Sequence, residues 1–287
     1  MSPTPASTPC PAPTAPANVL SIAGTDPTGG AGIQADLKTF GALGAYGMAV
    51  VTAVVAQNTQ AVRVVSPLAP ELVQAQLEAV FEDVTVAAVK IGMVANAEIA
   101  EAIAEVLARH RPPFVVFDPV MAASTHKRLM NESDLERIRT VLLPQVSLLT
   151  PNLKEAARLL DIAQPVDEAG MRTCLPALQA LGVPNVLLKG GHLAEDAPES
   201  TDLLATPEGV IRLSAPRIVT RHGHGTGCTL SSAIAALWPR HGLEKATRMA
   251  KDYVHGALLH ADALQVGHGR GPLHHFWQAV HLPGQLA

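Results

Sequence analysis

The stretch NVLSIAGTDPTGGAGIQADLKTFGAL, residues 18–43, begins with an apolar run, continues through a glycine-rich loop and ends in an amphipathic segment. The run 18–23 has the composition of a strand that is covered on both faces, and the segment 31–43 has the periodicity of a helix. A strand followed by a short loop and a helix is the repeating unit of a parallel α/β sheet. This stretch therefore predicts the start of an α/β fold.

The same alternation continues along the rest of the chain. We predict further strands at 49–57, 87–91, 114–118, 146–150 and 186–189. We predict helices at 71–81, 97–108, 132–142, 153–160, 168–181, 226–238 and 243–264. Residues 202–218 have strand-like halves around 207–209, which predict a β-hairpin near the edge of the sheet. The pattern as a whole predicts one mostly parallel sheet with helices between its strands, in a single domain over residues 18–287.

Composition limits the class of partner. The net charge is −4 and no run of Lys or Arg with interleaved aromatic residues occurs, so we expect no nucleic-acid partner and no membrane surface. No stretch reaches about 18 consecutive apolar residues, the length that a membrane span needs. The three cysteines are widely spaced and form neither a disulfide framework nor a metal knuckle, which favours a reducing cytoplasm. We therefore expect a small-molecule partner.

Residues 1–17 are rich in Pro, Ala and Thr, and they lack the basic and apolar regions of a signal peptide. Such a composition cannot bury enough apolar surface to fold by itself. We expect a disordered tail there.

Motifs that carry polar or glycine residues follow the predicted strands. In open α/β sheets, the loops that leave the carboxyl ends of the strands line the binding crevice. The motifs in these positions are GTDPTGGAG (24–32), QNT (57–59), GM (92–93), DPVM (118–121), TPNLKE (150–155), KGGH (189–192) and HGHGTGC (222–228). We expect one binding site to form along this edge.

The motif GTGC opens the predicted helix 226–238 and is the strongest of these signals. Small residues at a helix start leave its first N–H groups bare, and Gly225 and Gly227 would let the backbone approach an anion closely. Thr226 would place a hydroxyl near the N-cap. Cys228 falls in the first turn, where the helix dipole lowers the pKa of a thiol, so a thiolate base is expected. The alternatives are an ordinary glycine-bearing helix start and a buried, inert cysteine.

Three other features are less specific. The loop 24–32 matches neither a Walker motif nor a clean dinucleotide fingerprint, and the residues alone assign no task to Asp26 and Asp36. Lys189 ends an apolar strand and suits a cation that contacts phosphate. Asn152 and Glu155 lie three residues apart at a helix start, where they would either hold Mg²⁺ through its waters or form a capping box.

His222, His224 and Cys228 lie close together in the sequence and are candidate zinc ligands. Zinc sites need three or four ligands with defined spacing, and the flanking glycines instead favour an approach of the backbone to an anion. We therefore expect no zinc site there.

Taken in order, the motifs AGTDPTGGAGIQADLKTF, VVAQNTQ, KIGM, DPVM, LLPQVSLLTPNLKEA, KGGH and HGHGTGCTLSSA resemble those of the hydroxymethylpyrimidine/phosphomethylpyrimidine kinases of thiamine biosynthesis. The resemblance runs from about residue 18 to about residue 277. It implies a three-layer αβα sandwich of the ribokinase-like superfamily. It also implies transfer of the γ-phosphoryl group of ATP to the hydroxymethyl oxygen of the pyrimidine, and then a second transfer that gives the diphosphate.

The resemblance also implies roles for individual residues. Cys228 would be the catalytic base, in the place where related sugar kinases have an aspartate. Lys189 and Thr226 would contact phosphate, and Asn152, Glu155 and Asp118 would form the Mg²⁺ network. The residues that would surround the pyrimidine ring are Gln57, Gly24, Ala31, Asp36, Met93 and Val120. A homodimer is the expectation for the family.

One segment departs from the family pattern. After DPVM, residues 122–128 read AASTHKR instead of a small-residue run with Ser-Gly-Asp, so the second phosphorylation is less firmly implied than the first.

Two alternative functions stay open at this point. One is a pyridoxal kinase, which also phosphorylates a ring hydroxymethyl group, and the other is a non-catalytic module that binds the pyrimidine.

Overall fold

The computed structural model describes residues 15–121, 132–191, 193 and 197–279. Most of the expected tail and the whole of the departing segment 122–128 lie outside the described residues. No helix in the described ranges combines the length and the apolar character that a membrane crossing requires.

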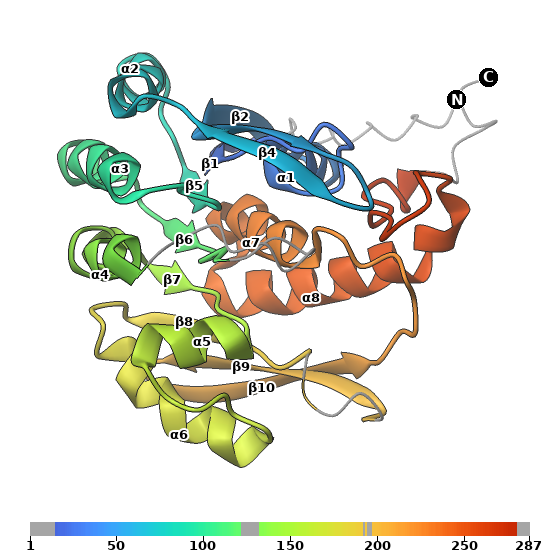
Figure 1. The fold of residues 1–287 in the computed structure, drawn as a ribbon. Coiled ribbons are helices and arrows are strands. Elements are labelled where there is room, and N and C mark those ends of the chain that lie inside the picture. Colours follow the sequence, from blue (N-terminus) through green and yellow to red (C-terminus); the bar gives the residue numbers. More distant parts are fainter. Residues whose placement is uncertain (1–14, 122–131, 192, 194–196, 280–287) are drawn as a thin grey trace, which may run out of the picture.

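A large sheet forms the centre of the described chain, with the strand order β10-β9-β8-β7-β6-β5-β1-β2 (Figure 1). The strands from β2 to β8 in this order pair in parallel, and β8, β9 and β10 pair antiparallel. Their bounds are β1 Asn18–Ala23, β2 Tyr46–Val51, β5 Ala88–Ile91, β6 Val115–Phe117, β7 Leu148–Leu149, β8 Asn185–Lys189, β9 Glu199–Thr206 and β10 Gly209–Pro216. The predicted mostly parallel sheet and the edge hairpin are both confirmed.

Helices cover both faces of the sheet, so the molecule has three layers (Figure 1). One layer contains α2 (Pro70–Phe81), α3 (Ala97–His110), α4 (Glu132–Val141), α5 (Leu153–Leu160) and α6 (Glu168–Gln179). The other contains α1 (Gly32–Ala42), α7 (Thr226–His241) and α8 (Leu243–Leu259). Successive side chains of a strand point to opposite faces of the sheet, so neighbouring residues pack against different helix layers. Leu20 packs against the layer of α2 to α6, and Val19 packs against the layer of α1, α7 and α8. The αβα fold class is confirmed, and each predicted helix is present with small shifts at its ends.

The prediction of one strand at 49–57 is wrong, because the chain leaves the large sheet at Thr52. The Thr52 hydroxyl donates to the Met93 carbonyl (2.6 Å), and its N–H donates to the Ala23 carbonyl (3.0 Å), which ends β2 beside β1. The next segment, β3 (Ala53–Gln57), pairs antiparallel with β4 (Val62–Pro67), a strand that we did not predict. These two strands form a separate small sheet.

The small sheet has an inner and an outer face. Val55 and Val65 are opposite each other in the ladder, and both line the cavity described below. Val54 and Val64 point the other way and are 52% and 56% exposed. Because both faces of the small sheet are apolar, its strands do not alternate between polar and apolar residues. The boundary between β2 and β3 therefore cannot be predicted from the hydrophobic pattern of the sequence.

Candidate active site

A cavity of about 410 Å³ lies at the carboxyl ends of the parallel strands, between the small sheet and the start of α7. It collects nearly all the residues that the sequence analysis singled out. The predicted site residues that line it are Gly24, Ala31, Gln57, Met93, Asp118, Val120, Asn152, Glu155, Lys189, Gly225, Thr226, Gly227 and Cys228. Asp36 is the predicted site residue that the structure does not place in this lining.

The start of α7 presents its first amides to the cavity. Gly225 is the N-cap, with φ of 84°, and no side chain caps the helix. A Cβ at this position would lie 1.8 Å from the carbonyl oxygen of Gly30, so the close backbone contact requires glycine. Thr226, the first residue of the helix, donates its hydroxyl to the Gly223 carbonyl (2.9 Å). This geometry suits an anion, because helix N-termini offer both bare N–H groups and a positive dipole end.

An ion pair lies beside these amides. Lys189 Nζ is 2.6 Å from Asp118 Oδ1, and both side chains are largely buried. A Cβ on Gly227 would lie 3.1 Å from Asp118 Oδ2 and 3.2 Å from Lys189 Nζ, so glycine leaves room for the pair next to the helix. Burial alone would lower the pKa of Lys189, but Asp118 and Glu155 outweigh this effect and raise it. Lys189 is therefore a cation at neutral pH.

Asn152 and Glu155 form a capping box at the start of α5, which was one of the two alternatives from the sequence. The Asn152 side chain accepts from the N–H groups of Lys154 and Glu155, and the Glu155 carboxylate accepts from the Asn152 N–H (2.8 Å). Both residues also line the cavity, so capping does not exclude a contact with a ligand. Burial raises the pKa of Glu155 to about 7, Lys189 opposes this rise and Asp118 adds to it.

The acidic residues fit a magnesium ion that is shared with phosphate groups. Mg²⁺ usually takes one or two carboxylates from the protein and its remaining ligands from water and substrate phosphates. Asp118 and Glu155 offer such a pair at the cavity wall. Over the part of the chain that the structure describes, no group of three or more His, Cys, Asp or Glu side chains is placed to hold a metal ion.

Cys228 lies in the first turn of α7, as predicted, but its pKa differs from the expectation. Burial raises the pKa of the thiol to about 11; the Lys90 cation and the N–H of Gly32 oppose this rise, while Asp36 and Asp118 add to it. The expected lowering of the thiol pKa is therefore wrong for the free protein, because burial outweighs the effect of the nearby cation.

The residues expected around the pyrimidine ring line the same cavity as Lys189, with one exception. Gly24 must lack a side chain, since a Cβ there would lie 2.3 Å from Met93 Cε. The Gln57 side chain lies close enough to Asp26 to help lower the pKa of that carboxyl group. Asp36 is the exception, because it is fully buried in α1 and is hydrogen-bonded to other protein side chains. Direct contact between Asp36 and a ligand in the cavity is not supported.

Asp26 organises the glycine-rich loop, a role that the sequence did not reveal. Its carboxylate accepts from the N–H groups of Gly30 and Ala31 at 3.2 and 2.8 Å, and its Oδ2 lies 2.8 Å from His224 Nε2. Burial would raise the pKa of Asp26, but the hydrogen bonds from His224 and Thr28, with the nearby Gln57 side chain, outweigh it and lower the pKa below its usual range. Asp26 thus joins the loop after β1 to the loop before α7.

The three-layer fold places the chain in the class of small-molecule kinases, because solved pyridoxal kinases share it. The structure of the pyridoxal kinase from Staphylococcus aureus in complex with ADP has a TM-score of 0.84 and 31% sequence identity, covering 92% of this chain and 95% of that one. The family model described as phosphomethylpyrimidine kinase matches residues 26–274, and the chain belongs to this family.

Individual members of that family are similar over most of their length. The chain is 55% identical to the hydroxymethylpyrimidine/phosphomethylpyrimidine kinase of Salmonella typhimurium, over 90% of this chain and 97% of the relative. The crystal structure of phosphomethylpyrimidine kinase from Clostridium difficile is 39% identical, with a TM-score of 0.74, and covers 84% of this chain and 99% of that one. The resemblance stated from the motifs is confirmed.

A Glu155→Gln variant is expected to be more stable than the wild-type protein at pH 8, because glutamine keeps the capping hydrogen bonds without a buried charge. The pKa of Glu155 rises from 4.5 to about 7 on folding. Ionisation of this carboxyl group therefore lowers the free energy of unfolding of the protein as the pH rises through this range. Thermal unfolding should show an advantage of roughly 2 °C or more at pH 8 that vanishes near pH 4.5. Glu168→Gln is the control, since its exposed carboxylate is paired with Arg172 and Arg212 and should give no gain. Equal melting temperatures of wild type and Glu155→Gln at pH 8 contradict the raised pKa.

Proposed function

We propose that the protein phosphorylates 4-amino-5-hydroxymethyl-2-methylpyrimidine with ATP, and then phosphorylates the monophosphate to the diphosphate. The observation that carries this proposal is that one cavity contains the bare amides of α7, Lys189, Cys228 and the residues implied for pyrimidine binding other than Asp36. Membership of the phosphomethylpyrimidine kinase family supports the substrate class. The ADP complex of the related pyridoxal kinase supports ATP as the phosphate donor.

The reaction is an in-line transfer. The hydroxymethyl oxygen forms a bond to the γ-phosphorus, the bond between that phosphorus and the bridging oxygen of ADP breaks, and the hydroxyl proton leaves to a base. The amides of Thr226, Gly227 and Cys228, together with Lys189, are placed to stabilise the charge on the transferring group. We assign the base to Cys228 Sγ, which must be deprotonated to accept the proton.

Gln57 and Met93, which line the same cavity, are assigned to the ring. An aminopyrimidine presents a donor and an acceptor side by side, which the amide of Gln57 can match. The methionine sulfur offers a polarisable contact to the ring. Gly24, Ala31 and Val120 line the same cavity and are also assigned to the surroundings of the ring.

Magnesium is part of the proposal. Asp118 and Glu155 would hold Mg²⁺ together with the phosphates, and Asn152 would keep Glu155 in place through the capping box. The metal would neutralise phosphate charge when bound. The carboxylates must be ionised to bind it, so the raised pKa of Glu155 implies weaker metal binding below pH 7.

We further propose that the protein is a cytoplasmic homodimer. The outer face of the small sheet exposes Val54 and Val64. A second copy of the chain would cover this apolar surface. Analytical ultracentrifugation should give twice the mass of the chain, and Val54→Lys should shift the protein towards the monomer. A wild-type protein that sediments as a monomer at micromolar concentration contradicts the dimer.

The substrate is tested by a coupled ADP-release assay with mass analysis of the product. The hydroxymethylpyrimidine should give the higher kcat/KM in comparison with pyridoxal, by roughly tenfold or more, and the diphosphate should accumulate after the monophosphate. The comparison matters because the solved pyridoxal kinases share the fold at TM-score 0.84. A preference for pyridoxal would make the protein a pyridoxal kinase. Binding of the pyrimidine in calorimetry without ADP release would make it a binding module.

The role of Cys228 is tested by Cys228→Ala. We expect kcat to fall by roughly 10²- to 10⁴-fold with little change in KM for the pyrimidine, as for loss of a general base. Cys174→Ala is the matched control, because Cys174 is buried in α6 and its thiol donates to the Met171 carbonyl. Wild-type turnover in Cys228→Ala would reject the assignment.

A further inference from the structure

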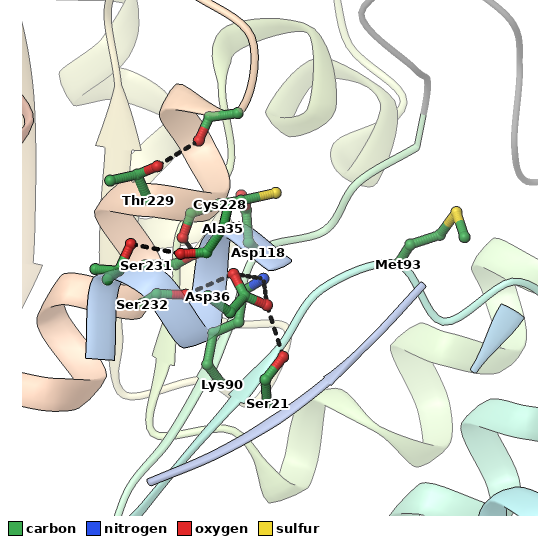
Figure 2. Close-up of polar contacts among 12 residues, drawn as sticks. Ser21, Ala35, Asp36, Lys90, Met93, Asp118, Cys228, Thr229, Ser231 and Ser232 are labelled. Carbon is green, nitrogen blue, oxygen red and sulfur yellow. Dashed lines mark hydrogen bonds and ion pairs between the residues drawn. The ribbon is translucent and has the colours of Figure 1, made fainter. Parts of the chain in front are cut away.

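A fully buried ion pair lies beneath the cavity. Lys90, on β5, donates from Nζ to both carboxylate oxygens of Asp36, on α1, at 2.9 and 2.8 Å, and both side chains are 0% exposed. Two hydroxyls complete the shell of the carboxylate: Ser21 donates to Oδ2 (2.6 Å) and Ser232 donates to Oδ1 (2.7 Å). Figure 2 shows Asp36 at the centre of these contacts, which come from β1, β5, α1 and α7.

Stability alone does not account for this pair. A buried ion pair is often no more stabilising than apolar residues of the same volume, because two charges must be removed from water. The rest of β5 is apolar and fully buried, so an apolar side chain would suit position 90 by packing alone. Packing alone therefore does not explain the charge at this position.

Lys90 is connected to the cavity although water does not reach it. It belongs to the cavity lining, and a Cβ on Gly92 would lie 2.8 Å from its Nζ. Burial would lower the pKa of Lys90, but Asp36, Cys228 and Asp118 outweigh this and raise it. Lys90 is thus a cation at neutral pH that Asp36 holds in the same cavity lining as Cys228.

The same network also fixes the helix that carries the thiol. Ser232 lies four residues after Cys228 on α7, so the two side chains share one face of the helix. The bond from Ser232 to Asp36 turns this face towards the ion pair. The Asp36 carboxylate therefore contacts both the Lys90 ammonium group and the helix that carries the Cys228 thiol.

We propose that Lys90 is a positioning residue for the kinase reaction: held by Asp36, its ammonium group stabilises the thiolate of Cys228. The inference rests on the proposed function of the site, because it gives that thiolate the task of accepting the hydroxyl proton. Lys90 transfers no proton itself and touches no reacting atom.

Lys90 and Asp36 shift the pKa of the Cys228 thiol in opposite directions. Lys90 and the N–H of Gly32 favour the thiolate, whereas burial, Asp36 and Asp118 disfavour it. Removing the cation should therefore raise the pKa of the thiol, and removing the carboxylate charge should lower it. A general loosening of the fold would not produce shifts of opposite sign.

The test is the pH dependence of alkylation of Cys228 by iodoacetamide, followed by mass spectrometry in a Cys10→Ser background. Cys174 is 4% exposed and serves as the internal slow thiol. We expect Lys90→Met to slow the alkylation of Cys228 at pH 8, by about tenfold for each unit of pKa, and Asp36→Asn to accelerate it. Lys251→Met is the matched control, because it breaks another largely buried pair, with Asp202 at 2.6 Å, and should leave the Cys228 thiol unchanged.

Either single variant leaves one buried charge without its partner, so a double variant is included. Asp36→Asn/Lys90→Gln keeps neutral hydrogen-bonding groups, and we expect it to fold and to raise the pKa of the thiol. An unchanged or lower thiol pKa in Lys90→Met or in the double variant overturns the proposal. Shifts of the two single variants in the same direction overturn it as well.

Activity supplies the second readout. In the double variant, kcat for the pyrimidine should fall at least tenfold at pH 7.5 while KM stays within a factor of about three, because the ring contacts are untouched. Alkylation is measured without nucleotide or pyrimidine, so it tests Lys90 independently of the substrate. If the wild-type protein releases no ADP but the thiol shifts occur, the proposed function fails and the electrostatic link between Lys90 and Cys228 stands.

Discussion

The backbone contact between the start of α7 and the glycine-rich loop after β1 is the constraint on which the site depends. Gly225 adopts φ of 84°, and a Cβ there would lie 1.8 Å from the carbonyl oxygen of Gly30. Asp26 locks the same junction, since it holds the amide of Gly30 and lies 2.8 Å from His224. Because these segments are fixed without a side chain at the helix start, the first amides of α7 stay available to an anion, with Lys189 beside them.

Much of the fold could be predicted because its signals are local. Parallel strands that are buried on both faces read as apolar runs, and the helices between them have a clear period, so the αβα sandwich and the edge hairpin follow from the sequence. The small sheet could not be predicted in this way. Its first strand continues β2 in composition, and the break at Thr52 depends on hydrogen bonds to Ala23 and Met93, which are distant in sequence.

In the site, too, some features could be predicted from the sequence and others could not. Glycines and polar residues that follow strands gather at one edge for a topological reason, so the cavity lining was predictable. The electrostatics were not, because they depend on burial. The helix dipole predicts a lowered pKa for Cys228, whereas its surroundings raise that pKa to about 11. Asp36 was assigned to the ring by resemblance, but it lies beneath the cavity and holds Lys90, whose charge within an apolar strand was the signal available in the sequence.

The central claim is that the amides at 226–228 receive the transferring phosphoryl group beside the sulfur of Cys228. The most direct measurement is a crystal structure of the protein with MgADP, aluminium fluoride and the hydroxymethylpyrimidine. We expect fluoride ligands at about 3 Å from these amide nitrogens, with the hydroxymethyl oxygen within hydrogen-bonding distance of Sγ. A fluoride group bound elsewhere, with the start of α7 facing only solvent or protein, would contradict it.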